Sequence, residues 1–197
     1  MIWFDELRRA MPSHPGAGDV VDWAAVEAGW ETSFPRDFKE FMAEYGAGAI
    51  DDYLTVLLAE PRGGFADGPA YMGMADESRN AEDLWPPGYG KPRLIAWGLD
   101  SSADILCWRA DGDDPDRWPV VVWSRGGGRW AEYPGGMAEF LCRVFRAEFD
   151  RCPLGDSALW GAAAPRFLHN DEERRLWDSG IDPWTGEADP FAGMFGD

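Results

Sequence analysis

The sequence has few of the residues on which cross-linking and much catalysis depend, with 3 cysteines and 2 histidines in 197 residues. Cys107, Cys142 and Cys152 are odd in number and lack Cys-x-x-Cys spacing, which argues against a disulfide framework or a zinc site. We expect free thiols in a reducing cytoplasm, with Cys107 and Cys142 buried. No run of about eighteen apolar residues predicts a transmembrane helix. The start, Met1–Glu6, lacks the basic-then-apolar pattern of a signal peptide, so we expect none.

Basic residues are also scarce, since 18 Lys and Arg stand against 36 Asp and Glu, for a formal net charge of -18. This balance argues against binding to nucleic acid or to an anionic membrane surface, both of which would be repelled. It permits a basic protein partner, because long-range attraction would speed the encounter. The alternative is an acidic protein whose charge serves only solubility.

Motifs of common catalytic sites are missing, including the Gly-x-Ser-x-Gly, His-Glu-x-x-His, phosphate-loop and dinucleotide patterns. His14 and His169 lie in loop-like or peripheral segments and are predicted to be surface residues. Gly126–Gly128 lacks the Lys and Ser/Thr of a phosphate loop and predicts a hairpin turn. We therefore expect no enzyme activity, no catalytic residues and no cofactor. A carboxylate pair for glycoside chemistry stays open, because an acidic chain offers many pairs and none stands out.

Four short runs rich in aromatic and β-branched residues predict an antiparallel meander. They are Leu94–Asp100, Asp104–Arg109, Val120–Arg125 and Arg129–Tyr133. Tight turns or an acidic loop, residues 111–116, separate them. Indole rings are too large to be left in solvent at regular spacing, so we expect the tryptophans of these runs to anchor the packing of the sheet: Trp97, Trp108, Trp123 and Trp130. The alternative is that tryptophans line a ligand cleft. For Trp177 and Trp184, packing and an interface role stay equally open.

Apolar spacing of three to four residues predicts helices before, within and after this region. The expected helices are Phe4–Met11, Trp23 to about Gly29, Pro35–Tyr45, Asp76–Trp85, Met137–Arg146 and Arg166–Trp177. Ile50–Leu58 is predicted to be one strand. The predicted fold class is α+β, one antiparallel sheet of about five to six strands with helices on one face. We expect a domain over residues 1–152 and a C-terminal extension over 153–197, with weak order from Asp178 to Asp197.

The order of motifs along the chain resembles that of the SUKH superfamily. The early motifs are Trp23-x-x-Val26-Glu27, Phe34-Pro35-Arg36-Asp37-Phe38-Lys39-x-Phe41 and Tyr45-Gly46-Ala47-Gly48. The later ones are Leu94-Ile95-Ala96-Trp97-Gly98, Asp104-Ile105-Leu106-Cys107-Trp108 and Met137-Ala138-Glu139-Phe140-Leu141. The resemblance covers about residues 20–150. This superfamily includes a yeast cell-wall regulator and many bacterial immunity proteins. The resemblance implies an α+β, non-enzymatic binding module that in bacteria often neutralises a toxin.

The first functional hypothesis is an immunity-type cytoplasmic protein that sequesters a bacterial toxin domain, for example a basic nuclease. The alternative is a regulatory or scaffold domain that binds a host protein or a small ligand, and an enzyme ranks third. Residues 99–118 hold six acids against two bases, so the charge is concentrated there. The acids predicted to bind the partner are Asp100, Asp104, Asp111, Asp113, Asp114 and Asp116. For residues 111–116 a solvated turn is favoured over a metal site, and we expect no bound metal. The oligomeric state stays open.

Overall fold

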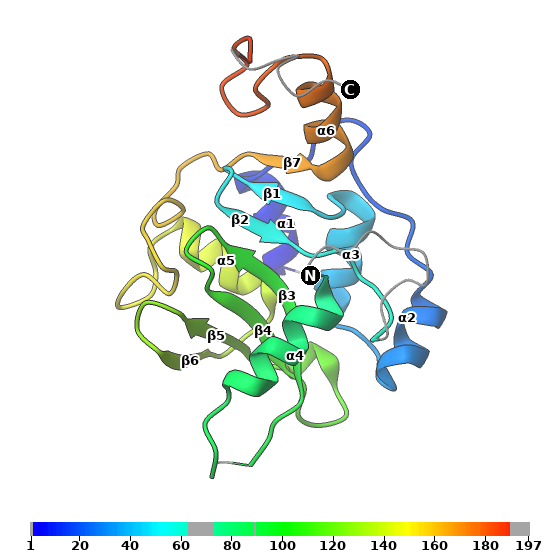
Figure 1. Cartoon of the computed structure of the whole chain (residues 1–197), viewed down its shortest axis with the longest axis vertical. Helices are drawn as coiled ribbons and strands as arrows, with labels where there is room; N and C mark the ends of the chain where they lie inside the picture. The colour runs from blue at the N-terminus through cyan, green and yellow to red at the C-terminus, as the bar shows by residue number, and fades with distance from the viewer. Residues whose placement is uncertain (1, 63–72, 89, 190–197) are drawn as a thin grey trace.

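In the part of the chain that the structure describes, seven strands form one antiparallel sheet with six α-helices around it (Figure 1). This computed structural model describes residues 2–62, 73–88 and 90–189. The strands are β1 (Gly48–Ile50), β2 (Leu54–Val56), β3 (Leu94–Asp100), β4 (Ile105–Arg109), β5 (Val120–Ser124), β6 (Arg129–Tyr133) and β7 (Phe167–His169). Their order across the sheet is β6-β5-β4-β3-β2-β1-β7. The predicted α+β class and the meander from β3 to β6 are confirmed, in a sheet slightly larger than expected.

The helices lie close to where the apolar spacing placed them. They are α1 (Ile2–Ala10), α2 (Trp23–Trp30), α3 (Arg36–Glu44), α4 (Met74–Leu84), α5 (Met137–Phe145) and α6 (Asn170–Asp178). Asp22 starts α2, since its carboxylate accepts a hydrogen bond from the backbone N–H of Ala25. Gly29 does not end this helix. The last residue is Trp30, and the next, Glu31, adopts the left-handed conformation with φ of 51°.

The predicted single strand Ile50–Leu58 is wrong, because the chain reverses within it. Asp51 and Asp52 both have left-handed backbone conformations, with φ of 49° and 54°. The N–H of Tyr53 donates to the carbonyl of Ile50 and closes the turn between β1 and β2. Two central residues with positive φ form a turn that matches the twist of a hairpin, and aspartate tolerates this conformation better than most residues. The reversal went unpredicted because the segment has no glycine.

Helices cover both faces of the sheet, not one as predicted. On one face Trp97 and Trp108 contact Phe140 of α5 and Phe38 of α3, with ring centroids 6.1 and 4.9 Å apart. On the other, Ser78 of α4 accepts a hydrogen bond from the Ala96 N–H of β3 at 2.8 Å. Figure 1 shows α4 in front of β3 and β4, with α5 and α1 behind. Strand β3 is accordingly buried almost throughout, as its continuous apolar run indicates.

The core lies mainly between the sheet and α1, α3 and α5. Of the tryptophans predicted to pack there, Trp97 and Trp108 are fully buried. Phe41 of α3 and Phe140 of α5 are buried with them, as expected. The three cysteines are unpaired, and Cys107 and Cys142 are buried.

After α5 the chain adds one more strand, β7, to the sheet and then leaves the sheet as α6. Strand β7 pairs antiparallel with β1, and Phe167 packs against Phe41 and Tyr45 at centroid distances of 5.6 and 5.4 Å. The predicted helix Arg166–Trp177 therefore begins late, at Asn170. Helix α6 buries none of its residues, and it stands out from the sheet with the segment that follows it (Figure 1).

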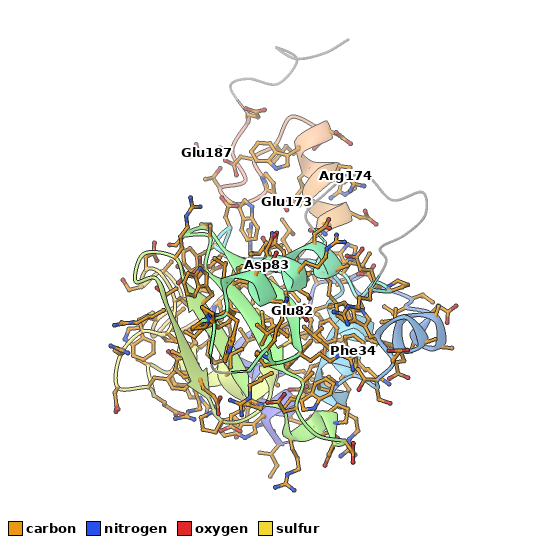
Figure 2. All side chains as sticks on the ribbon, turned by 60° about the horizontal axis from the view of Figure 1, so that its bottom comes forward. Phe34, Glu82, Asp83, Glu173, Arg174 and Glu187 are labelled. Carbon is orange, nitrogen blue, oxygen red and sulfur yellow. The ribbon has the colours of Figure 1, made fainter. Side chains whose placement is uncertain are left out.

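In Figure 2 the labelled side chains of Glu173, Arg174 and Glu187 lie in this projecting part. Those of Glu82 and Asp83, on α4, lie away from it. Residues 190–197, within the segment for which weak order was expected, lie outside the described residues. The predicted domain boundary after Cys152 stays a prediction. None of the helices described is long and apolar enough to cross a membrane.

Candidate protein-binding surface

The six aspartates predicted to bind a partner lie at opposite ends of the β3–β4 hairpin. Asp100 and Asp104 flank the turn that joins the two strands, while the other four follow β4 in its connection to β5. Asp100 and Asp104 are also buried, with exposed fractions of 6% and 0%. The structure therefore brings together only the loop aspartates: Asp111, Asp113, Asp114 and Asp116.

Asp100 connects several segments inside the protein. One carboxylate oxygen accepts from the backbone N–H groups of Ser102 and Asp104, both at 2.9 Å. The other accepts from the hydroxyl of Tyr53 and the N–H of Gly155, both at 3.0 Å. A carboxylate with four donors in a buried setting stabilises a fold, and its oxygens are already satisfied. Asp100 is thus a structural residue.

The loop between β4 and β5 is held at both ends. Asp116 accepts hydrogen bonds from the backbone N–H and from the guanidinium Nε of Arg36, the first residue of α3, at 2.7 and 2.5 Å. Burial alone would raise the pKa of Asp116, but the hydrogen bonds from Arg36 outweigh it, so the pKa is lowered. Asp114 starts a short 3-10 helix, Pro115–Arg117, by accepting from the N–H of Asp116. The buried Trp118 follows and donates from its indole nitrogen to the Gly112 carbonyl at 3.2 Å.

Asp111 and Asp113 point outward from this rigid loop. Asp111 forms an ion pair with Nε of Arg109 at 2.7 Å. Asp113 is exposed and has no hydrogen-bond or ion-pair partner among the described residues. Arg109 also pairs with Glu132 on β6. One arginine therefore lies between two acids, and the local charge stays negative.

Three half-buried tryptophans lie on β5, on β6 and just beyond α4, and for two of them, Trp123 and Trp130, the sequence pattern predicts a packing role. Trp123 and Trp130 are direct cross-strand partners on β5 and β6, with ring centroids 5.6 Å apart. Trp85, just beyond α4, lies 5.1 Å from Trp130. The indole of Trp130 donates to the carbonyl of Leu84 at 3.3 Å. Helix α4 packs over β3 and β4 and ends here, so among the described residues no helix packs over this side of β5 and β6.

Alternation along the strands puts the acids and the tryptophans on one side of the sheet. Trp130 and Glu132 are two residues apart on β6, so they project from the same face. Arg109 then connects Glu132 to Asp111. We name this surface the aromatic–acidic face, formed by Trp85, Trp123, Trp130, Glu132 and Asp111, with the exposed Asp113 two residues further along the same loop. Tryptophan is enriched among residues that contribute most to binding energy at interfaces, and charged residues gather at interface rims.

One of the two histidines does not lie as predicted. His169 is buried, and its Nε2 lies 3.2 Å from a carboxylate oxygen of Asp19. Its Nδ1 accepts from the N–H of Asp171 and so caps α6. His14 accepts from the backbone N–H of His169 at 3.2 Å. The expectation of two surface histidines is thus wrong for His169, which joins an N-terminal segment to β7 and α6.

Within residues 2–62, 73–88 and 90–189, no three His, Cys, Asp or Glu side chains gather in a way that could hold a metal ion. The same is true of the aspartates of residues 111–116. The polar groups of that loop are instead used in helix starts and ion pairs.

One antiparallel sheet with helices on both of its faces defines a module of α+β class. Residues 21–141 match the SUKH family described as SMI1-KNR4 cell-wall, and the chain belongs to this family. The match runs from just before α2 into α5, and it contains the whole aromatic–acidic face. It confirms the resemblance carried by the motif order. No curated protein and no solved structure matches the chain.

Proposed function

We propose that this protein is an immunity-type binding module that neutralises a basic bacterial toxin, such as a nuclease, by covering its active surface. It acts by binding and carries out no catalysis of its own. Membership of the SMI1-KNR4 family supports a protein-binding role in general. The observation that carries the finer proposal is the aromatic–acidic face, where three partly exposed tryptophans share one side of the sheet with exposed acids.

The chemistry of this face fits a basic partner. A nuclease is positively charged where it grips phosphate groups, so an acidic surface can occupy the same groove. Asp111, Asp113 and Glu132 supply carboxylates for that purpose. Trp123 and Trp130 supply apolar area with little conformational freedom to lose on binding. The net charge of -18 would also steer a basic partner from a distance.

The proposed location is the bacterial cytoplasm, where an immunity protein meets a toxin made by its own cell or by kin. The unpaired cysteines Cys107, Cys142 and Cys152 support a reducing compartment. The same charge argues against nucleic acid or an anionic membrane as the ligand.

The test takes its toxin from the genes that flank this one in its own genome, among which the proposal expects a toxin domain. Cells that express the toxin are expected to grow when the full chain is co-expressed, and the two purified proteins are expected to form a complex. The variant Trp130→Ala combined with Asp111→Asn, Asp113→Asn and Glu132→Gln should lose at least tenfold in affinity and fail to protect. A thermal melt of each variant shows whether it is folded.

A matched control removes acids elsewhere. Glu31→Gln with Asp178→Asn changes two exposed carboxylates, after α2 and at the end of α6, and should protect as the parent does. Failure of the parent chain to bind or to protect contradicts the toxin proposal. Binding of a host protein through the same face would instead favour the regulatory alternative.

A further inference from the structure

The segments that flank the 21–141 family match meet at the β7 edge of the sheet (Figure 1). The segment before α2 contributes His14 and Asp19, and the junction of β7 with α6 contributes His169. His14 and His169 are the only histidines in the chain. Histidine is the side chain that ordinarily changes its charge between about pH 5 and pH 8. A contact between these two rings is therefore a place where pH can act on the fold.

The contacts of His169 require the neutral ring. Its Nδ1 lies 3.1 Å from the backbone nitrogen of Asp171, whose N–H group can only donate, so Nδ1 accepts and carries no hydrogen. The ring hydrogen is therefore on Nε2, which lies 3.2 Å from one carboxylate oxygen of Asp19. The other oxygen of Asp19 accepts from the N–H of Ala47, just before β1, at 2.7 Å. His169 thus caps α6 and, through Asp19, connects it to the start of β1.

His14 is in the same situation. Its Nε2 accepts from the backbone N–H of His169 at 3.2 Å, on the edge strand of the described sheet. Its Nδ1 lies 3.2 Å from the carbonyl oxygen of Pro15, which can only accept, so Nδ1 carries the hydrogen. All four ring nitrogens therefore have a partner, and each ring uses one nitrogen as a donor and the other as an acceptor.

An added proton fits neither ring. On His169 it would set one N–H group against the N–H of Asp171, and it would put a positive charge at the N-terminus of α6, where the helix dipole disfavours it. On His14 the added N–H would face the N–H of His169. Asp19 favours a charge on His169, but it contacts Nε2, which already carries a hydrogen in the neutral ring. The loss therefore falls on the two contacts in which the rings accept.

Few other charges face the two rings. Beyond Asp19, those among the described residues belong to two ion pairs on α6, Asp171 with Arg174 and Glu172 with Arg175. The end of α3 and strand β1 approach His169 with Gly46 and Gly48, which bring no charge. No carboxylate besides Asp19 contacts a ring nitrogen in the described part of the chain, so little compensates for the contacts that protonation breaks.

We propose that His14 and His169 form a pH-sensitive switch that docks β7 and the start of α6 on the sheet at neutral pH and releases them as the pH falls below about 6. The docked state has no place for an added proton and the released state has, so protons shift the balance toward release. Only a three-residue pairing with β1 and the packing of Phe167 oppose it. The switch and the proposed toxin-binding face lie at opposite edges of the sheet, so each is tested separately.

Hydrogen exchange of the full chain at about pH 7.5 and about pH 5.5 tests the switch, on either side of the range in which histidine titrates. Once the intrinsic effect of pH on exchange is corrected for, protection of the amides of residues 168–171 should fall at least about tenfold in acid. The amides of β3 and β4 should keep theirs. NMR signals of the two histidine rings should titrate with the same midpoint as this loss. No loss, a different midpoint, or an equal loss in β3 and β4 overturns the proposal.

The double variant His14→Gln with His169→Asn leaves no histidine in the chain. Asparagine still offers an oxygen to cap α6, and glutamine still offers an acceptor to the edge strand, but neither side chain titrates. Protection of residues 168–171 should then be equal at both pH values. Glu77→Gln is the matched control, because it removes another buried titratable group, on α4, and should keep the acid response. An acid response that persists in the double variant contradicts the switch. If that variant is unprotected even at the higher pH, the two midpoints of the parent chain decide.

Discussion

At the residue scale, the stability of the molecule depends on a few large side chains at the sheet–helix interface. Trp108 is fully buried and lies within 6.3 Å of three rings, those of Phe34, Phe38 and Trp97. Its indole nitrogen has no hydrogen-bond partner among the described residues. The residue thus stabilises the fold through its packed apolar area, while its unsatisfied N–H group opposes this.

The first prediction follows from this packing. Trp108→Ala should lower the free energy of unfolding by about 3–5 kcal/mol, because it leaves a large cavity among rigid rings. Trp108→Phe should cost much less, since it fills most of the space and removes an unsatisfied donor. Chemical denaturation measures both. Equal losses for the two variants would show that the indole nitrogen has a partner in solution.

Glu77 of α4 gives a prediction about pH. The residue is 2% exposed, and its Oε1 has no partner among the described residues. Burial raises its pKa, the nearby Asp76 adds to this, and a hydrogen bond from Asn80 opposes it. The folded state therefore binds the proton more tightly than the unfolded state. Protonation stabilises the fold as the pH falls, and this stability is lost as the pH rises through the folded-state pKa.

Glu77→Gln should accordingly stabilise the protein at pH 7 by about 1 kcal/mol, because no buried charge remains to be desolvated. The gain should shrink as the pH falls through the raised folded-state pKa of Glu77, where the parent takes up its proton. Denaturation curves at several pH values measure this difference. A gain that is constant with pH, or a loss at pH 7, would mean that the carboxylate is satisfied or exposed.

The tryptophans show the limit of sequence reasoning at this scale. Trp97, Trp108, Trp123 and Trp130 occupy similar positions in similar runs, and all were assigned to packing. Two are fully buried and two are half-buried, because helices cover β3 and β4 while α4 ends before β5 and β6. Whether a strand residue is covered depends on where a distant helix ends. The local pattern does not contain that information.

At the element scale, the parts with strong local signals were predicted and the parts set by tertiary contacts were not. Tight turns join β3 to β4 and β5 to β6, and they force neighbours in sequence to pair. Strand β7 has three residues and forms because β1 offers it an edge and Phe41 and Tyr45 offer a place for Phe167. The turn between β1 and β2, at Asp51 and Asp52, contains no glycine, so the local pattern does not predict it.

The contrast between β7 and the segment after α6 gives a prediction about truncation. Arg166 lies over the ring of Trp184 at 4.9 Å and also donates to the Pro183 carbonyl, and these contacts are near the surface. Removing residues 180–197 should therefore lower the midpoint of thermal unfolding by less than about 4 °C, the effect of roughly 1 kcal/mol in a chain of this size.

Removing residues 166–197 should have a larger effect, because Phe167 leaves the core and β1 becomes an unpaired edge. Burial of one such side chain contributes about 1.5–3 kcal/mol. Calorimetry of both truncated chains beside the full chain makes the comparison. A large drop for the shorter deletion would show that the last segment packs onto the body.

At the scale of the whole molecule, some of the acids stabilise the fold and others stay exposed on the surface. Of the six aspartates predicted to meet a partner, Asp100 and Asp104 are buried, while Asp114 and Asp116 hold the loop in shape. Asp111 and Asp113 stay available. Glu132 joins them only through the pairing of β5 with β6, so a local count of charge did not find it.

The last prediction separates the two parts of the aromatic–acidic face by kinetics. Asp111→Asn, Asp113→Asn and Glu132→Gln together should slow association with the neighbouring toxin domain and flatten its dependence on salt, because exposed charges act mainly on the encounter rate. Trp130→Ala should instead speed dissociation and leave the salt dependence as it is, because a desolvated ring acts after contact.

Rates at about 0.05 M and 0.5 M salt measure both effects, on either side of the range where screening becomes strong. Asp114 and Asp116 stay unchanged in this design, so the loop keeps its attachment to Arg36. An association rate that is indifferent to salt and to the three substitutions would contradict electrostatic steering, while loss of the salt dependence in Trp130→Ala would show that the two parts do not act separately.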